Sequence, residues 1–544
     1  MRLLQLPLAT LMLVTVSAAP PVNWRDARPV TAAHAMVVTE QHLASEVGLS
    51  VLRRGGNAVD AAVAVGYALA VVDPCCGNIG GGGFMLIRMN DGKERFIDFR
   101  EEAPLRATRD MYLDARGNPI PQRSRKGWLA VGVPGTVLGL ETARREYGTM
   151  SRAALMAPAI RLARMGFRLV PGDRVGWLSV HDGYVRRPGL AATLALIARD
   201  GTHAFYRGTI ARAIVAASEK GGGILTVRDF THYRVVESVP MHCTYRGFDL
   251  ILAPPPSSGG VTLCEMLGIL APYPLSHWSW HGTRETHYVV EAERRAYADR
   301  NAFLGDPAYV RDPAAQLLAP AYLARLRSTI APRRATPSRD IRPGAGVIDR
   351  EHAQTTHYSI VDAHGNAVAV TYTLNDYFGA GIEVDGVVLN DEMDDFTSKP
   401  GTPNMYGLVQ STANEIAPGK RPLSSMAPTI VTRNGKLFMI TGSPGGGRII
   451  TIVFETLSNV LDYHMNVAQA VDAPRIHMQW LPDEIQYEPG ALSATVMLPL
   501  ESDGYKLHEF ESWGSAQAIV VDPLTHLLEG GSDRRTPQGS AIGY

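Results

Sequence analysis

The stretch Gln354-Thr355-Thr356-His357-Tyr358-Ser359 is a polar step into a predicted β-hairpin, two-thirds of the way along the chain. A threonine hydroxyl is a weak nucleophile unless a base lies beside it. If the chain is cut just before Thr355, the freed α-amine is such a base, and its reference pKa of about 7.7–8.0 leaves a useful fraction neutral near pH 7. Threonine also begins many ordinary strands, so the surrounding sequence has to decide between the two interpretations.

The sequence after this step predicts antiparallel strand pairs. Asn434-Gly435 is the strongest of the turns, because Asn-Gly favours a tight hairpin. The predicted pairs are residues 357–362 with 367–373, residues 429–432 with 437–440, and residues 516–521 with 526–529, the last of which closes the chain. Strands in such pairs need helices or a second sheet to cover their apolar faces.

The sequence before the step is predicted to be mainly helical. Residues 39–53 have helical spacing, and Asn57 caps a nearly all-apolar helix over residues 58–72, which indicates burial on most faces. Amphipathic helices such as residues 209–220 fill most of residues 150–330. Together with the hairpins, these helices predict an α+β protein in which sheets pack face to face beneath helices.

Several charged residues before the Gln354-Thr355 step can be interpreted as ordinary surface ion pairs. Residues 287–299 carry Glu291, Arg294 and Arg295 at helix spacings, which we interpret as a solvated face with ion pairs. Arg100, beside Glu101, forms either a surface ion pair or a fork that holds a substrate carboxylate. The sequence leaves both interpretations of Arg100 open.

Two glycine-rich runs attract attention. The run Gly77-Asn78-Ile79-Gly80-Gly81-Gly82-Gly83 precedes a predicted strand over residues 84–88. A dinucleotide loop has the opposite order of strand and helix, so we interpret this run as permitting close backbone approach. The run Gly442-Ser443-Pro444-Gly445-Gly446-Gly447 precedes a predicted helix over residues 448–457. Its amides form either a plain tight turn or a site for an oxyanion.

The composition excludes some classes of function. The 544 residues contain 53 basic and 53 acidic side chains, and this zero net charge argues against a general affinity for nucleic acid or anionic membranes. A short basic start, apolar residues 3–16 and small residues 17–19 predict a signal peptide cut after Ala18. The alternative is an uncleaved anchor, but the apolar run is short for a membrane span. We expect an exported mature protein that is not in the membrane.

The cysteines and histidines give little further guidance. Cys75 and Cys76 are adjacent, which is poor geometry for a bridge between them, whereas pairing of Cys243 with Cys264 stays open. His277 and His281 lie among loop residues without a metal-binding motif, so we interpret them as surface or packing residues. Residues 333–346 are rich in Arg, Pro, Ser and Gly, which predicts a linker leading to the Gln354-Thr355 step.

Several of these motifs, in the same order, closely resemble the γ-glutamyltranspeptidase family over essentially the whole mature chain. They are Gly55-Gly56-Asn57-Ala58-Val59-Asp60-Ala61-Ala62, the Gly80–Gly83 run, Asp98-Phe99-Arg100-Glu101, Gln354 to Ser359, Arg421-Pro422-Leu423-Ser424-Ser425-Met426, Gly442-Ser443-Pro444-Gly445-Gly446 and Gly514-Ser515-Ala516-Gln517. The resemblance implies a four-layer αββα sandwich of the N-terminal nucleophile hydrolase type.

The resemblance also implies a proenzyme that cuts itself between Gln354 and Thr355. A large subunit, residues 19–354 after the signal peptide 1–18, then stays with a small subunit, residues 355–544. The implied substrates are glutathione and other γ-glutamyl compounds, with amino acids or peptides as acceptors. No metal or organic cofactor is implied. Because the resemblance looks bacterial, the periplasm is the expected location, with secretion as the alternative.

The implied roles follow the matched motifs. Thr355 is the nucleophile and Thr373 the threonine that orients it, while Gly445 and Gly446 supply oxyanion-hole amides. The substrate zwitterion is held by Arg100, Ser424 and Ser425 at its α-carboxylate and by Asn375, Glu392 and Asp395 at its α-ammonium. We expect the Arg100 cation and the Glu392 and Asp395 carboxylates to be held apart. Many bacterial relatives have Gln where this chain has Glu392. Residues 400–406 resemble a lid loop with Tyr406 at its tip.

Two alternatives remain at this stage. Acylases of the same superfamily act on cephalosporin or glutaryl side chains, and these acyl groups have no α-ammonium. A carboxylate such as Asp395 would be costly to bury in such an acylase, so its presence here favours γ-glutamyl substrates. The second alternative is an uncut protein that only binds amino-acid zwitterions. A denaturing gel separates one chain from two, and γ-glutamyl and glutaryl anilides separate the two acyl groups.

Overall fold

The computed structural model describes residues 23–341 and 354–544, and the predicted signal peptide and the end of the predicted linker lie outside them. Two large sheets, each of seven strands in the described chain, form the centre of the molecule. The first sheet consists, in spatial order, of β1 (Val30–Ala32), β21 (Leu528–Ser532), β20 (Gln517–Val521), β16 (Lys436–Gly442), β15 (Thr429–Arg433), β10 (Phe248–Leu252) and β9 (Met241–Tyr245).

The second sheet carries the Gln354-Thr355 step at its centre. It consists, in spatial order, of β22 (Ser540–Gly543), β2 (Met36–Thr39), β11 (Gln354–Val361), β12 (Ala367–Asn375), β3 (Gly82–Arg88), β4 (Glu94–Asp98) and β8 (Val236–Ser238). All neighbouring strands in both sheets pair antiparallel. Both sheets therefore contain strands from before and after Thr355, so the two parts of the chain interlock.

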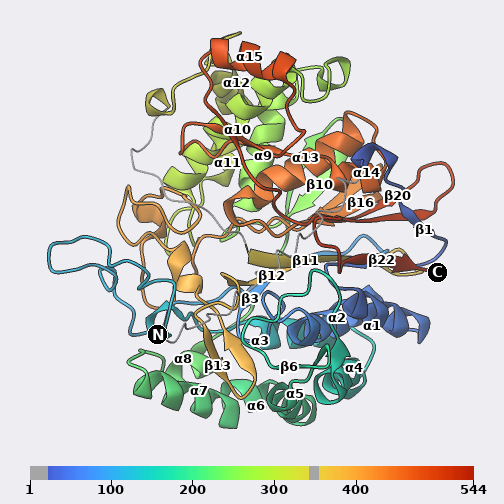
Figure 1. Ribbon diagram of the computed structural model, residues 1–544, viewed down its shortest axis with the longest axis vertical. Coiled ribbons are helices and arrows are strands. Elements are labelled where there is room, and N and C mark those ends of the chain that lie inside the picture. Colours follow the sequence, from blue (N-terminus) through green and yellow to red (C-terminus); the bar gives the residue numbers. More distant parts are fainter. Residues whose placement is uncertain (1–22, 342–353) are drawn as a thin grey trace, which may run out of the picture.

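Helices cover the outer face of each sheet (Figure 1). Those against the second sheet are α1 (His42–Arg53), α2 (Ala58–Val72), α3 (Thr136–Tyr147), α4 (Arg152–Met165), α5 (Pro188–Asp200), α6 (Thr202–Tyr206), α7 (Thr209–Lys220) and α8 (Val227–His232). Those on the side of the first sheet are α9 (Gly259–Leu270), α10 (Thr283–Phe303), α11 (Ala314–Leu317), α12 (Pro320–Ser328), α13 (Ile449–Leu461), α14 (Val467–Asp472) and α15 (Ala494–Ser502). The result is the αββα sandwich that the resemblance implied.

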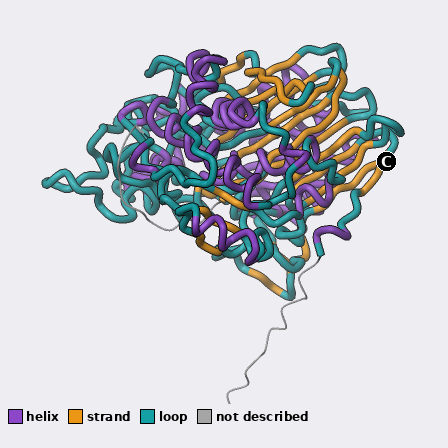
Figure 2. Tube along the Cα trace, turned by 90° about the horizontal axis from the view of Figure 1, so that it is seen from above, coloured by secondary structure: helices purple, strands orange, loops and turns teal. Residues whose placement is uncertain are grey.

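The alternation of side chains along the strands explains the layers. In β2, Met36 and Val38 point into the core that lies between the two sheets, whereas Val37 points into the core beneath α1 and α2. Apolar residues on both faces of a strand are typical of a sheet that is covered on both sides. Seen after a 90° turn, the strands gather at the end of the molecule where the C-terminus lies (Figure 2).

Helix α2 holds the two central strands in place. Asn57 caps it as predicted, accepting from the Asp60 amide at 2.9 Å. Every residue of α2 is buried, which confirms the prediction from its apolar sequence. The Tyr358 hydroxyl of β11 and the Tyr372 hydroxyl of β12 donate to carbonyls of α2, at 3.1 and 3.0 Å. The strand that begins at Gln354 is thus fixed from the helical layer.

Most predicted elements are confirmed, with shifted ends. The three strand pairs are present, as is α7 over Thr209–Lys220. However, α1 begins at His42 because β2 occupies Met36–Thr39. The strand β22 follows β21, so the predicted third pair does not close the chain. The region of residues 150–330 also contains strands that the sequence analysis missed, including β8, β9 and β10.

Further short strands lie outside the two large sheets. They are β5 (Phe167–Arg168), β6 (Val180–His181), β7 (Tyr184–Val185), β13 (Ile382–Val384), β14 (Val387–Leu389), β17 (Ile476–His477), β18 (Ile485–Tyr487) and β19 (Leu507–Glu509). Within residues 23–341 and 354–544, no helix is long and apolar enough to cross a membrane.

Two predictions about side chains are wrong. Cys75 and Cys76 form a disulfide with each other, although adjacent cysteines rarely do, and Cys243 pairs with Cys264 to join β9 to α9. Glu291, Arg294 and Arg295 make ion pairs, but their face of α10 is buried rather than solvated. The physical reason is that C-terminal residues such as Tyr505 pack over this face, which the local helix pattern does not reveal. His281 is a buried packing residue, in line with one of the two readings given above.

Candidate active site

Thr355 lies at the start of β11, next to the end of β12. Its hydroxyl donates to the Thr373 hydroxyl at 3.3 Å, and both side chains are buried. The Thr373 oxygen also accepts the backbone N–H of Asn375 at 2.8 Å. The register between the two strands shifts between Gln354 and Thr356, at the level of these threonines. Such an irregularity re-aims side chains at the edge of a ladder, here around Thr355.

The first glycine run allows the end of β12 to lie where it does. A Cβ atom on Gly81 would stand 2.0 Å from the Thr373 carbonyl oxygen, so a larger residue cannot replace it without moving β12. The Asn78 side chain donates to that same carbonyl at 2.9 Å. The run therefore permits close backbone approach, as predicted, and it fixes the residue that contacts Thr355.

Arg100 is buried, which excludes the surface ion pair that the sequence left open. The chain leaves β4 through a turn in which the Arg100 amide donates to the Asp98 carboxylate at 2.8 Å. Arg421 forms ion pairs with Asp98 and Glu102, and the Arg100 guanidinium donates to the Pro422 carbonyl at 3.2 Å. Arg421 thus ties the segment around Arg100 to the segment that carries Ser424 and Ser425.

The charged residues of the site pair with one another. The Arg100 guanidinium contacts Glu392 and lies 2.5 Å from the Asp395 carboxylate and 3.7 Å from that of Glu101. The expectation that cation and carboxylates are held apart is therefore wrong, because buried charges of opposite sign gain most by pairing. Burial raises the pKa of Glu392 and Asp395, although Arg100 opposes this. Burial likewise raises the pKa of Glu101 to about 7.

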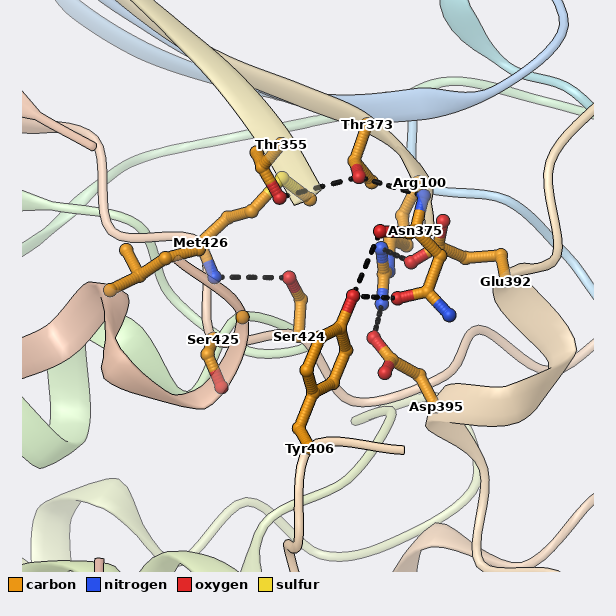
Figure 3. Close-up of a pocket in the computed structure, with 12 residues that line it drawn as sticks. Arg100, Thr355, Thr373, Asn375, Glu392, Asp395, Tyr406, Ser424, Ser425 and Met426 are labelled. Atoms are coloured by element: carbon orange, nitrogen blue, oxygen red, sulfur yellow. Dashed lines mark hydrogen bonds and ion pairs between the residues drawn. The ribbon is translucent and has the colours of Figure 1, made fainter. Parts of the chain in front are cut away.

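Ser424 and Ser425 lie on a segment that runs beside the loop before α9. Ser424 forms a parallel bridge with Ser257, and its amide donates to the Pro256 carbonyl at 3.0 Å. The Ser424 hydroxyl accepts the Met426 amide at 3.1 Å, as Figure 3 shows. The Ser425 hydroxyl accepts a hydrogen bond from Arg300 at 2.8 Å. Both serines therefore have fixed backbone positions beside the cluster around Arg100.

Gly445 and Gly446 form the turn between β16 and α13. Their φ angles are +145° and +51°, which L side chains rarely adopt, and a Cβ on Gly446 would lie 2.4 Å from the Tyr406 ring. A 3-10 turn over Gly446–Arg448 precedes α13, so the helix begins one residue later than predicted. The Tyr406 hydroxyl donates to the Asn375 side-chain oxygen at 2.6 Å. Tyr406 therefore bridges the glycine turn and Asn375, and Figure 3 shows its hydrogen bond to Asn375.

These residues surround one small cavity of about 20 Å³. Its described lining consists of Arg100, Thr355, Thr373, Asn375, Glu392, Asp395, Tyr406, Ser424, Ser425, Met426, Gly446 and Ile449. Every predicted site residue is in this lining except Gly445, which adjoins Gly446. Thr355 also lines a second cavity of about 700 Å³, together with Glu40 and Asp73. Thr355 is the residue that these two described linings share.

The sequence analysis missed two buried groups behind the cavity. Glu101 was named only as a motif residue and as the neighbour of Arg100, and Arg300 was not considered, since its helix carries other charged residues at similar spacings. No local signal marks Arg300, because its partners other than the adjacent Asn301 come from distant parts of the chain. The buried charge next to Arg100 becomes visible only in the folded structure.

A threonine at the start of a central strand of an αββα sandwich, facing a buried cavity lined by charged groups, defines the fold class of the N-terminal nucleophile hydrolases. The family model described as Gamma-glutamyltranspeptidase matches residues 44–174 and 178–543. The chain therefore belongs to the γ-glutamyltranspeptidase family.

Individual relatives agree with this assignment. The chain is 50% identical to the glutathione hydrolase proenzyme of Pseudomonas sp. (strain A14), with 95% of each chain covered. It is 46% identical to that of Escherichia coli (strain K12), covering 97% of this chain and 95% of the relative. Among solved structures, cephalosporin acylase from Bacillus halodurans superposes with a TM-score of 0.84 at 26% identity, covering 98% of this chain and 99% of the acylase.

Proposed function

We propose that this chain hydrolyses glutathione and other γ-glutamyl amides and transfers the γ-glutamyl group to amino acids or peptides. It does so after cutting itself between Gln354 and Thr355. The observation that carries the proposal is the cavity in which the Thr355 hydroxyl faces both a buried arginine and two buried carboxylates. A γ-glutamyl group ends in an amino-acid zwitterion, which needs one partner of each sign.

The self-cut yields two subunits that stay together. Residues 19–354 and 355–544 contribute strands to both sheets, and β11 lies between β2 from the first part and β12 from the second. Separating the subunits would expose the cores on both sides of each sheet. The exported location, with the periplasm favoured, belongs to this proposal and rests on the N-terminal residues outside the described chain.

Recognition of the γ-glutamyl group exchanges one set of ion pairs for another. The substrate α-carboxylate binds to Arg100, Ser424 and Ser425, and its α-ammonium binds to the remaining polar groups, Asn375, Glu392 and Asp395. Arg100 exchanges a protein carboxylate for the substrate α-carboxylate, and the Glu392 and Asp395 carboxylates exchange Arg100 for the substrate α-ammonium. Little net charge is therefore left uncompensated in the buried site, which matters because an unpaired buried charge is strongly unfavourable.

The chemical step is an acyl transfer in two stages. Thr355 Oγ1 attacks the γ-carbonyl carbon while the freed α-amine of Thr355 takes the hydroxyl proton. Thr373, in contact with Thr355, orients the nucleophile, and the amides of Gly445 and Gly446 stabilise the oxyanion. The amine leaves with a proton from the α-amine, and water or an acceptor amine then attacks the γ-glutamyl ester. The second cavity at Thr355 offers room for the leaving and accepting amines.

Tyr406 closes this site from one side. It is 4% exposed, and it contacts both the glycine turn and Asn375. A side chain in this position excludes water from the ester, and its movement would admit substrate. We propose that the loop carrying Tyr406 influences the balance between hydrolysis and transfer.

A related acylase activity is the second candidate, supported by the close superposition on a cephalosporin acylase. The buried Asp395 favours the γ-glutamyl group, because glutaryl compounds lack the ammonium that would compensate this carboxylate. Turnover of γ-glutamyl and glutaryl anilides decides between them. We expect a preference for the γ-glutamyl anilide, and a preference for the glutaryl anilide would favour the acylase.

The test of self-cutting is a denaturing gel of the purified protein and of Thr355→Ala. We expect two bands for the wild type and, for Thr355→Ala, one band near the 58.9 kDa of the full chain less the mass of the signal peptide. Thr356→Ala, which alters the adjacent buried threonine, serves as the matched control and should still be cut. Two bands for Thr355→Ala would refute the assignment of Thr355, and one band for the wild type would favour an uncut binding protein.

A further inference from the structure

Arg300 is a second buried arginine beside the candidate active site. It lies in the last turn of α10, and 1% of its surface is exposed. Its guanidinium donates to the Ser258 hydroxyl at 2.9 Å, to the Asn301 side chain at 2.7 Å and to the Ser425 hydroxyl at 2.8 Å. Ser425 in turn lines the cavity that contains Thr355. One side chain thus connects α10 directly to the wall of the site.

The charge of Arg300 is not neutralised by an ion pair. Among the described residues, no carboxylate lies within 4.0 Å of its guanidinium, and all three of its hydrogen-bond acceptors are neutral. Burial lowers the pKa of Arg300 to about 10, which leaves the side chain positively charged near pH 7. The charge acts on the site, since burial raises the pKa of Asp395 and Arg300, together with Arg100, opposes that rise. A buried cation without a partner is costly, so its position calls for an anion.

The hydrogen bonds of Arg300 also fix the segment that carries the serines. Ser258, which accepts from Arg300, donates through its own hydroxyl to the Ser424 carbonyl at 2.6 Å. Arg300 therefore holds Ser424 through Ser258 and holds Ser425 directly. A planar guanidinium that donates in two directions constrains this geometry more tightly than a lysine ammonium. Because the Ser425 oxygen accepts from Arg300, its own O–H is directed away from Arg300 and can donate to an anion.

We propose that Arg300 is a positioning residue for the α-carboxylate of the substrate: it orients Ser424 and Ser425 and adds a second positive charge behind them. Arg100 would then contact the carboxylate from one side while Arg300 acts through the serines from the other. This inference rests on the proposed γ-glutamyl function. It predicts that Arg300 affects ligands according to whether they carry the carboxylate, and not according to whether they carry the ammonium.

The test compares three anilides in wild type, Arg300→Met and Arg300→Lys. The γ-glutamyl anilide carries both charged groups, the glutaryl anilide lacks the ammonium, and the 4-aminobutyryl anilide lacks the carboxylate. A charge-assisted hydrogen bond is worth about 1.5–3 kcal/mol, so we expect Arg300→Met to lower kcat/KM for the first two about 10- to 100-fold, mainly through KM. For the 4-aminobutyryl anilide we expect a change of less than about twofold. Arg300→Lys should recover part of the loss, since it restores the charge but not the fork.

Arg187 provides the matched control. It is also a buried arginine whose pKa burial lowers to about 10, and it donates to backbone carbonyls of Ala70 and Gly386, away from the site. Arg187→Met should lower stability without changing the ratio of the kcat/KM values among the three anilides. If Arg300→Met changed that ratio no more than Arg187→Met does, Arg300 would have only a structural role and the inference would be wrong.

Two further measurements keep the test decisive. If Arg300→Met does not fold, inhibition constants of the monoamide of glutarate and of 4-aminobutyramide for Arg300→Lys take its place, and only the monoamide of glutarate, which carries a carboxylate, should bind more weakly. The same constants apply if the 4-aminobutyryl anilide turns over too slowly. Equal weakening of both inhibitors would overturn the inference. A wild type that does not act on the γ-glutamyl anilide would instead overturn the proposed function, so the two failures are distinguishable.

Discussion

Two clusters of buried charge in this molecule look alike in sequence but differ in how well their atoms are paired. On α10, Arg295 donates to one carboxylate oxygen of Glu291 at 2.6 Å, that oxygen also accepts from the Thr336 hydroxyl, and the other oxygen accepts from the Thr336 amide and the Tyr505 hydroxyl. Around Arg100, by contrast, both carboxylate oxygens of Glu101 and one of Glu392 have no hydrogen-bond partner. In the first cluster both carboxylate oxygens of Glu291 have partners, and among its described charged groups only the Arg294 Nε, 3.4 Å from Glu291, lacks a hydrogen bond, whereas the second cluster has unpaired carboxylate oxygens and borders a cavity.

This difference indicates which observation separates a structural ion pair from a candidate binding site. Burial alone does not do so, because Arg100, Arg294 and Arg295 are each at most 2% exposed. Unsatisfied acceptors beside a cavity do, since such groups are costly unless a ligand completes them. The comparison can be tested by removing the arginine of each cluster in turn.

Arg100→Met should give the largest effect, and on activity. Loss of Arg100 leaves the Glu392 and Asp395 carboxylates without their cation and removes the proposed partner of the substrate carboxylate. Breaking a buried pair costs about 3–5 kcal/mol, so kcat/KM for a γ-glutamyl anilide should fall by about a thousandfold. Steady-state kinetics measures this. A loss of less than about tenfold would remove Arg100 from the site.

Arg295→Met also removes the cation of a buried ion pair, but we expect it to lower stability and not activity. Its loss leaves Glu291 buried without its closest cation and removes donors to Thr329. We expect the free energy of unfolding to fall by about 3–5 kcal/mol, while kcat/KM of the folded enzyme stays within about twofold. Denaturant unfolding in a Thr355→Ala background, where one chain is expected, checks the first part. A selective loss of activity would contradict the comparison.

The pH dependence of stability should have opposite signs in the two clusters. Burial raises the pKa of Glu101 to about 7, so its contribution to stability is fully present below its unfolded pKa of about 4.3 and is lost as the pH rises through 7. Burial also acts on Glu291, but Arg294 and Arg295 outweigh it and lower the pKa. Its contribution is therefore present above about 4.3 and is lost as the pH falls through the folded pKa.

Glu101→Gln and Glu291→Gln test these signs by unfolding at several pH values. Between pH 5 and pH 8, the free energy of unfolding of the parent chain should fall by about 1–3 kcal/mol because of Glu101. The Glu101→Gln variant should not show this fall. Glu291→Gln should cost most at neutral pH and progressively less in acid. The same sign of pH dependence in both variants would show that the clusters do not differ as described.

The sequence predicted the parts of this site that are encoded locally. Gln354-Thr355, the two glycine runs and the Ser424-Ser425 segment are short motifs. Thr355, Gly446, Ser424 and Ser425 line one cavity, and Gly81 of the first glycine run packs against Thr373 in its wall. Asn57 and the apolar residues of α2 likewise predicted a buried helix with correct ends. These features depend on neighbours in the chain, so local patterns contain them.

Features that depend on distant segments were not predictable in the same way. The burial of Glu291 requires Tyr505, and the role inferred for Arg300 requires Ser258 and Ser425. Strand β8 is recognisable only by its pairing with β4. Direct pairing of Arg100 with Glu392 and Asp395 was missed because the resemblance assigned them to opposite ends of a substrate, with no information on their contacts with each other.

The central claim is that Thr355 becomes the N-terminus of the catalytic subunit. The most direct measurement is the intact mass of the smaller fragment of the purified wild-type protein, with the Thr355→Ala protein measured alongside. We predict a wild-type fragment whose mass corresponds to residues 355–544, and an uncut Thr355→Ala chain. An active wild-type protein that is uncut, or whose smaller fragment begins at any other residue, would contradict the account.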